Sequence, residues 1–352
     1  DPDAGAGVGS VYAGEGPVME MIKPKNMRWA GMPGDIIDKN SFQQYIEYPL
    51  LEDSEFDEFF KDRTGWAMKK AIPRTSSTLE PLAKFQYSLG SANMCTRQVA
   101  SVFSQPDFRA MIQELWAIDS YYKEYQVKAN ELTKAVEDAG YPIYQGRGGG
   151  GVPFDYYSDF LRGTILTMED LYDRPEDIER FIDETIEGTL ENIRRSKDID
   201  PGKHIFMALH KGLDSFLNDE HYKTYYWRHL RKIIETLVEC GKIPYVFAEG
   251  KYDRRLDCLT EVPPGKVFFQ FEDVDMAVAK KKLGGIACIS GSFPAASLDW
   301  ETPQKIREMV KRHLDICAPG GGFIFMTSCG LGHCKRENVE AMFDAVREFG
   351  VY

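Results

Sequence analysis

The sequence predicts an α/β protein folded as a (β/α)₈ barrel (TIM barrel), and three observations lead to that fold class. From about residue 105 onward, long segments with apolar residues at helical spacing alternate with short apolar runs. These short runs recur at spacings of roughly 20 to 60 residues, which fits repeated strand–helix units. Polar residues stand at the end of one apolar run after another, as at the mouth of a barrel.

Six short apolar runs are the predicted strands. They leave no room for polar alternation, which is typical of a parallel sheet covered on both faces. The runs are 141–145, 205–210, 245–249, 267–272, 287–290 and 323–327. The polar residues at their carboxyl ends are His210, Glu249, Glu272, Ser290 and Cys329.

Four segments carry clear helical patterns, at 106–139, 220–240, from Pro303 to Cys317, and through Val339 to Val346. Asn218 or Asp219 is positioned to cap the second. Thr302 precedes Pro303, which is a favoured pair at the start of a helix. Residues 1–80 form an irregular lead-in, which we expect to pack on a barrel of residues 81–352 because its apolar residues are too scattered for a separate core.

Composition narrows the class of protein. The chain has 352 residues and a net charge of −12, which argues against nucleic-acid or anionic-membrane partners. It has no run of roughly 20 apolar residues that could span a bilayer. Its seven cysteines are odd in number and mostly lie within apolar patterns, so we expect free thiols and a cytoplasmic location.

Several collinear stretches resemble the uroporphyrinogen decarboxylase superfamily, which includes corrinoid-linked methyltransferases. They are Gly151-Val152-Pro153-Phe154-Asp155 with Phe160-Leu161-Arg162-Gly163, Leu283-Gly284-Gly285 to Ser290-Gly291-Ser292, and Gly320-Gly321-Gly322-Phe323-Ile324-Phe325 followed by Glu337-Asn338-Val339. The resemblance implies the barrel fold and a homodimer. The Arg-rich R-Q-A-G-R stretch of true uroporphyrinogen decarboxylases has no counterpart here, which disfavours that substrate.

The resemblance also implies a zinc site, because the methyltransferase branch holds zinc with an H-x-C motif and a later Cys. Here Phe247 and Glu249 replace the His and Cys, whereas Cys329 matches the later ligand. Glu249, Cys329 and His333 would complete a three-ligand set, with Cys334 or His210 as other choices for the third ligand. Alternatively, Glu249 is an acid paired with Arg or Lys and Cys329 is an inert thiol.

The remaining candidates surround the predicted mouth. His210 is placed to act as a general base, or as a structural hydrogen bonder. Glu272 is a further catalytic candidate that could orient the substrate or a protonated cofactor, or could equally be a surface acid. Arg147, within the glycine-rich run 146–151, could bind an anion or belong to a lid loop. Asp214, Tyr156 and Ser290 are the other predicted substrate contacts; Asp214 could stabilise positive charge in a decarboxylation, and Tyr156 could equally be core.

Methyl transfer is the predicted reaction, with a small methylated substrate and a corrinoid (cobalamin) protein or tetrahydrofolate as methyl carrier. The first alternative is a decarboxylase of the uroporphyrinogen decarboxylase type. The second is a barrel that binds a cofactor or partner without turnover, a possibility raised by the broken H-x-C motif.

Overall fold

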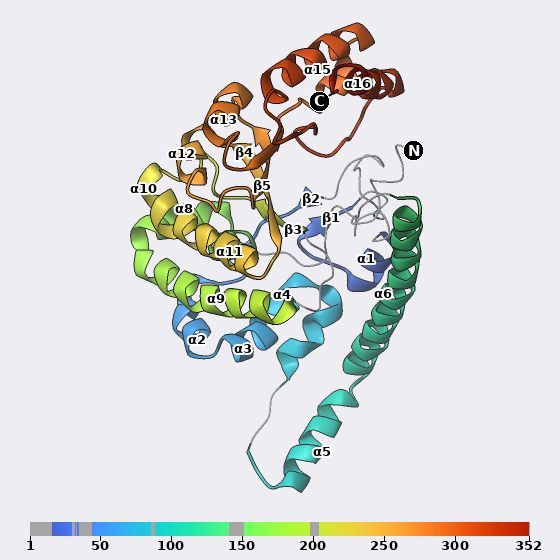
Figure 1. Ribbon diagram of the computed structural model, residues 1–352. Helices are drawn as coiled ribbons and strands as arrows, with labels where there is room; N and C mark the ends of the chain where they lie inside the picture. Colours follow the sequence, from blue (N-terminus) through green and yellow to red (C-terminus); the bar gives the residue numbers. More distant parts are fainter. Residues whose placement is uncertain are drawn as a thin grey trace. The chain divides into compact units, whose positions relative to one another are not determined.

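The computed structural model describes residues 16–29, 32, 34, 44–85, 89–140, 151–197 and 204–351 (Figure 1). Backbone contacts divide the chain into two compact units. The first comprises Asp1–Ile143 with Asp159–Thr167, and the second comprises Tyr144–Ser158 with Met168–Tyr352. The predicted arrangement, a lead-in of residues 1–80 packed on a barrel of residues 81–352, stays a prediction.

The described part of the first unit is mostly helical. Its short antiparallel ribbon pairs β1 (Met27–Arg28) with β2 (Gln44–Tyr45). Its helices are α1 (Gly16–Ile22), η2 (Asp53–Glu55), α2 (Phe56–Lys61), α3 (Arg63–Trp66), η3 (Ala67–Ala71), α4 (Ile72–Thr75), η4 (Ser77–Lys84), α5 (Ala92–Phe103) and α6 (Pro106–Asp138). The long α6 confirms the helix predicted over 106–139, and it begins with proline in its first turn.

The L-R-G element of the sequence is a structural anchor in this unit. Arg162 is buried in η5 (Ser158–Arg162), and its guanidinium donates to the Leu51 carbonyl and to Asp53 Oδ1, both at 2.7 Å. The same group lies 5.1 Å from the centroid of the Phe56 ring. Arg162 therefore fixes the segment around residue 51 against the start of α8 (Thr164–Asp173).

The second unit is built on a five-stranded parallel sheet of order β3-β4-β5-β6-β7. Its strands are β3 (His204–Leu209), β4 (Ile243–Lys251), β5 (Phe268–Asp273), β6 (Cys288–Gly291) and β7 (Phe323–Ile324). Five of the six predicted strands are thus confirmed, and β7 is shorter than the predicted run 323–327. The strand predicted at 141–145 lies outside the described residues.

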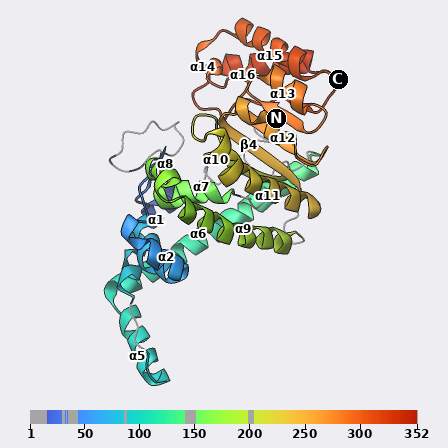
Figure 2. The ribbon, with the colours of Figure 1, turned by 90° about the vertical axis from the view of Figure 1, so that its left-hand side faces the viewer.

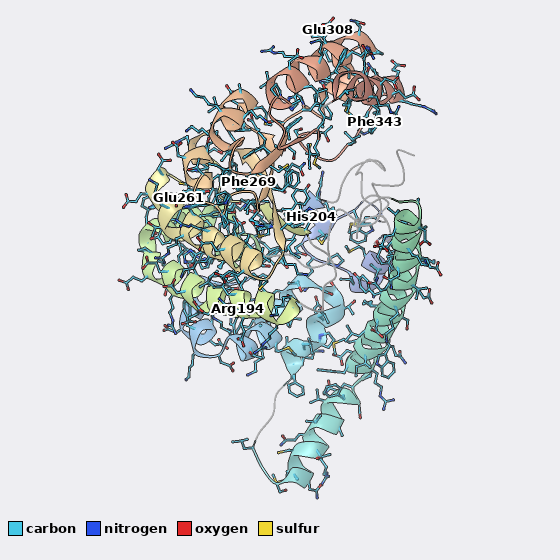
Figure 3. The ribbon with its side chains drawn as sticks, in the orientation of Figure 1. Arg194, His204, Glu261, Phe269, Glu308 and Phe343 are labelled. Carbon is cyan, nitrogen blue, oxygen red and sulfur yellow. The ribbon has the colours of Figure 1, made fainter. Side chains whose placement is uncertain are left out.

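One face of this sheet is fully buried under helices. Side chains of Ile205, Met207, Val246 and Phe269 point to that face, and each is less than a tenth exposed. Helix α11 (Arg228–Glu239) lies alongside β4 and α13 (Met276–Leu283) alongside β6 (Figure 2). Figure 3 labels Phe269 within the sheet and the exposed Glu308 on α15 (Pro303–Cys317).

The opposite face is only half-buried along β3, where Phe206 and Ala208 alternate with buried neighbours. The predicted cover on both faces therefore holds for β5, whose residues Phe268–Phe271 are all buried, but not for β3 in the described part of the chain.

The other helices of this unit are α7 (Pro153–Tyr157), α9 (Pro175–Ser196), α10 (Asp219–His221), η6 (Tyr222–Trp227), η7 (Asp253–Arg255), α12 (Leu256–Leu259), α14 (Ser297–Trp300) and α16 (Arg336–Phe349). Both predicted caps are confirmed: Asn218 accepts from the His221 N–H at 2.8 Å and Thr302 from the Lys305 N–H at 3.3 Å. The single helix predicted at 220–240 is interrupted by a π-helical stretch, η6, in which four aromatic residues are buried. Across the helices that the structure describes, none is long and apolar enough to cross a membrane.

Candidate active site

Two titratable side chains meet at the carboxyl end of neighbouring strands. His210 directly follows β3 and Glu249 lies near the end of β4, and their side chains are each 39 % exposed. His210 Nε2 lies 3.8 Å from Glu249 Oε2. A proton held by the imidazole therefore has a carboxylate beside it and remains accessible from outside.

A bulge in β4 presents Glu249 to this position. The register with β5 shifts between Ala248 and Lys251, and Gly250 there has a φ of +73°. The Gly250 N–H donates to Glu272 Oε2 at 2.6 Å. Glu272 therefore engages the backbone that follows Glu249, and this contact gives it a structural role that its position at the end of a strand did not reveal.

Within the sheet lies a chain of buried hydrogen bonds that the sequence analysis did not predict. The Tyr245 hydroxyl donates to Gln270 Oε1, and Gln270 Nε2 donates to the Thr327 carbonyl at 3.4 Å. Burial raises the pKa of Tyr245 to about 12, so its hydroxyl stays protonated. A polar residue inside the apolar run Phe268–Phe271 was the available signal, since buried polar groups need partners.

The turn after β3 is organised by Asp214 and Arg255. Asp214 Oδ2 accepts from the Arg254 N–H at 3.0 Å, and Asp214 Oδ1 lies 3.4 Å from Arg255 Nε. Arg255 also donates to the Gly212, Leu213 and Leu217 carbonyls and to Asp219. These contacts give Asp214 a structural role, in which it and Arg255 hold the turn after β3. Its predicted contact with substrate stays a prediction.

The other predicted substrate contacts are dispersed. Ser290 is fully buried in β6, where its hydroxyl lies 3.5 Å from Met326 Sδ. Tyr156 is exposed on α7, with its ring packed against Gly151. Arg147 and the rest of the run 146–150 lie outside the described residues.

The described part of the structure does not support the predicted zinc site. Strands β5 and β6 separate Glu249 on β4 from the loop after β7 that holds Cys329 and His333. Cys329 is engaged locally, since its carbonyl accepts from Thr327 Oγ1 at 2.8 Å and its sulfur lies 3.8 Å from Ser328 Oγ. Within the described ranges no three His, Cys, Asp or Glu residues are grouped to hold a metal ion. Zinc is therefore not supported, and the roles of Glu249, Cys329 and His333 as ligands stay predictions.

A cavity of about 400 Å³ lies at the opposite, amino end of the sheet. It is lined by His204 (labelled in Figure 3) and by residues that precede or begin the next strands, such as Ile243, Val267 and Cys288. None of the residues of the His210–Glu249 pair lines it. The His210–Glu249 pair and this cavity are therefore at opposite ends of the sheet.

A parallel sheet flanked by helices, with acid–base residues at its carboxyl end, is the arrangement of barrel enzymes. The chain belongs to the uroporphyrinogen decarboxylase (URO-D) family, whose sequence profile matches residues 92–349. This confirms the predicted resemblance and fold class, since the family is built on the TIM barrel. Closure of the barrel is not seen among the residues described, which contribute five adjacent strands.

The fold also matches 21 chains of solved structures. One is a methyltransferase from Methanosarcina mazei, with a TM-score of 0.54 and 13% identity, over 95% of this chain and 78% of that chain. At this identity the likeness shows the fold alone. No curated protein matches the sequence significantly. Members of the superfamily are enzymes, either decarboxylases or methyltransferases.

Proposed function

We propose that the protein is a methyltransferase that moves a methyl group from a small methylated substrate to a corrinoid protein, or to a folate. The observation that carries this proposal is the His210–Glu249 pair, 3.8 Å apart at the carboxyl end of β3 and β4. A proton donor with an adjacent carboxylate suits a reaction in which a heteroatom must be protonated as it leaves.

Each residue of the site has a separate role in the proposed reaction. His210 gives its proton to the substrate heteroatom, which keeps the electron pair of the broken bond to the methyl carbon. Glu249 stabilises the imidazolium before the transfer, and Glu272 holds the bulge that presents Glu249. An imidazole suits this role because it titrates near neutral pH. Tyr156 and Arg147 are proposed to contact the substrate.

The methyl carbon forms its new bond with a nucleophile that the carrier supplies; in a reduced corrinoid this nucleophile is the cobalt centre. The carrier is therefore a second substrate, and a corrinoid protein is the proposed partner. A homodimer and a cytoplasmic location remain predictions.

The test uses free cob(I)alamin as acceptor and three donor classes, aryl methyl ethers, methylamines and methyl thioethers. We expect methylcobalamin to form with one class, and His210→Ala to slow its formation by about 10²-fold or more. The matched control is His221→Ala, because His221 lies in α10 and contacts the Tyr225 ring rather than Glu249. Absence of methylcobalamin with all donors, or an unchanged rate in His210→Ala, would contradict the proposal.

Decarboxylation is the second candidate, supported by membership of the URO-D family. The same pair could protonate the carbon left after loss of carbon dioxide. Release of carbon dioxide from an aromatic or tetrapyrrole-like acid, without methyl transfer, would favour it. If wild-type protein binds a corrinoid or partner but turns over no substrate of either type, the non-catalytic alternative is favoured.

A further inference from the structure

A buried carboxylate lies behind His210. Asp155, from the P-F-D element in α7, is only 5 % exposed. Its Oδ1 accepts from the Lys211 N–H at 2.9 Å, and its Oδ2 accepts from the His210 N–H at 3.3 Å. The Tyr226 hydroxyl donates to the same Oδ2 at 2.7 Å. One side chain thus joins α7, the turn after β3 and helix η6.

The three hydrogen bonds at Asp155 can run in only one direction, from the donors to the carboxylate. A carboxylate taken out of water is strongly destabilising unless donors replace its hydration. Tyr226 is fully buried, and burial holds the pKa of its hydroxyl well above the ordinary value, so this group remains a donor. The two backbone N–H groups can only donate. All three therefore point their protons at Asp155.

The turn packs closely against this network. A Cβ on Gly212 would lie 2.7 Å from Tyr226 Cε1 and would also collide with the Tyr252 hydroxyl. The backbone two residues after His210 is therefore packed directly on the tyrosines that flank Asp155. A displaced turn would lose both this packing and the charge-assisted hydrogen bonds.

We propose that Asp155 is a positioning residue for His210: its carboxylate fixes the backbone of residues 210 and 211 and thereby sets the imidazole against Glu249. The catalytic consequence rests on the proposed function, whereas the positioning itself does not. Asp155 is not proposed to touch substrate.

The first test measures His210 directly in the intact protein. The variants are Asp155→Asn, which removes the charge and replaces one acceptor with a donor, and Tyr226→Phe, which removes one hydrogen bond. Diethyl pyrocarbonate modifies accessible imidazoles, and peptide mass spectrometry gives the rate at each histidine. In wild type His210 is already 39 % exposed, so displacement of the turn can raise its exposure only in part. We expect His210 to react about twofold faster in Asp155→Asn, because the displaced imidazole moves away from Glu249.

The matched control is Tyr222→Phe. Tyr222 lies on the same helix and is equally buried, and its hydroxyl has no hydrogen-bond partner in the described part of the chain. We expect its His210 rate to equal that of wild type, with Tyr226→Phe faster than both. If Asp155→Asn does not fold, the comparison of Tyr226→Phe with Tyr222→Phe decides. An unchanged His210 rate in folded Asp155→Asn, or equal rates in the two tyrosine variants, overturns the proposal.

The second test links positioning to catalysis. Asp155→Asn should slow methyl transfer in the wild-type background but not further in His210→Ala, because its effect passes through His210. Equal slowing in both backgrounds would mean that Asp155 does not act through His210. If no methyl transfer is found at all, the proposed function fails, and the rate of His210 modification still decides the positioning proposal.

Discussion

Replacing Arg255 by methionine should destabilise the second unit strongly. Arg255 is 1 % exposed, and its guanidinium donates to the Gly212 carbonyl at 3.1 Å, the Leu213 carbonyl at 3.2 Å and Asp219 Oδ1 at 2.8 Å. It also covers the Tyr222 ring, with 4.3 Å between the guanidinium carbon and the ring centroid. Methionine keeps the apolar stem but leaves the carbonyls without this donor, and it leaves the Asp214 carboxylate, 9 % exposed, without its ion-pair partner.

Breaking a buried charge pair by removing one partner costs roughly 3–5 kcal/mol, a large part of the stability of a typical domain. We therefore expect Arg255→Met to lower the free energy of unfolding of this unit by about 4 kcal/mol. Hydrogen–deuterium exchange across residues 204–259 measures it, because it reports local opening of this unit separately from the first.

Arg254→Met is the matched control. Arg254 is adjacent in sequence and pairs with Asp219 at 2.9 Å, but both side chains are exposed, so we expect a much smaller change. If the free energy of unfolding of Arg255→Met stays within about 1 kcal/mol of wild type, the contacts of Arg255 do not stabilise the turn and the reasoning is refuted.

Three further predictions concern backbone strain and pH. Gly250→Ala should lower the free energy of unfolding by about 1–2 kcal/mol because of its left-handed φ of +73°. It should lower it further because the new Cβ would lie 2.8 Å from Leu213 Cδ1. Gly241→Ala, at a φ of +74° with open space around it, measures the backbone contribution alone in urea unfolding. Hydrogen bonds from Arg74, with Lys70 and Trp66, lower the pKa of Glu55 from 4.5 to about 2. The first unit should therefore lose stability as pH falls from 4.5 to 2, and Glu55→Gln should flatten that slope. Burial lowers the pKa of His229 from 6.5 to about 4, so the second unit should lose stability from pH 6.5 down to 4, and titrated unfolding of His229→Gln should lack that loss.

Local signals in the sequence predicted much of this fold. The periodicity of α6, the caps Asn218 and Thr302, and the apolar runs of β3 to β7 depend on neighbours within a few residues. Polar residues at strand ends predicted that His210 and Glu249 would share one edge, because parallel strands align their carboxyl ends.

Pairings between distant residues could not be predicted in this way. Zinc was inferred by matching Glu249 and Cys329 to positions of a ligand motif, but the described residues include no group of three ligands that could hold a metal ion. The place of Glu272 at a strand end predicted a catalytic role, which stays a prediction, but it gave no sign of the hydrogen bond from the Gly250 N–H.

The sequence by itself determined four helical segments, the strands β3 to β7 and their order, and the edge of the sheet at which His210 and Glu249 stand. Only the tertiary structure decided which of those residues meet. Asp155 and Tyr226 are 71 residues apart, yet they share a hydrogen bond behind His210. Such contacts depend on how strands register and bulge, and that is set by the packing of the whole sheet rather than by any local pattern.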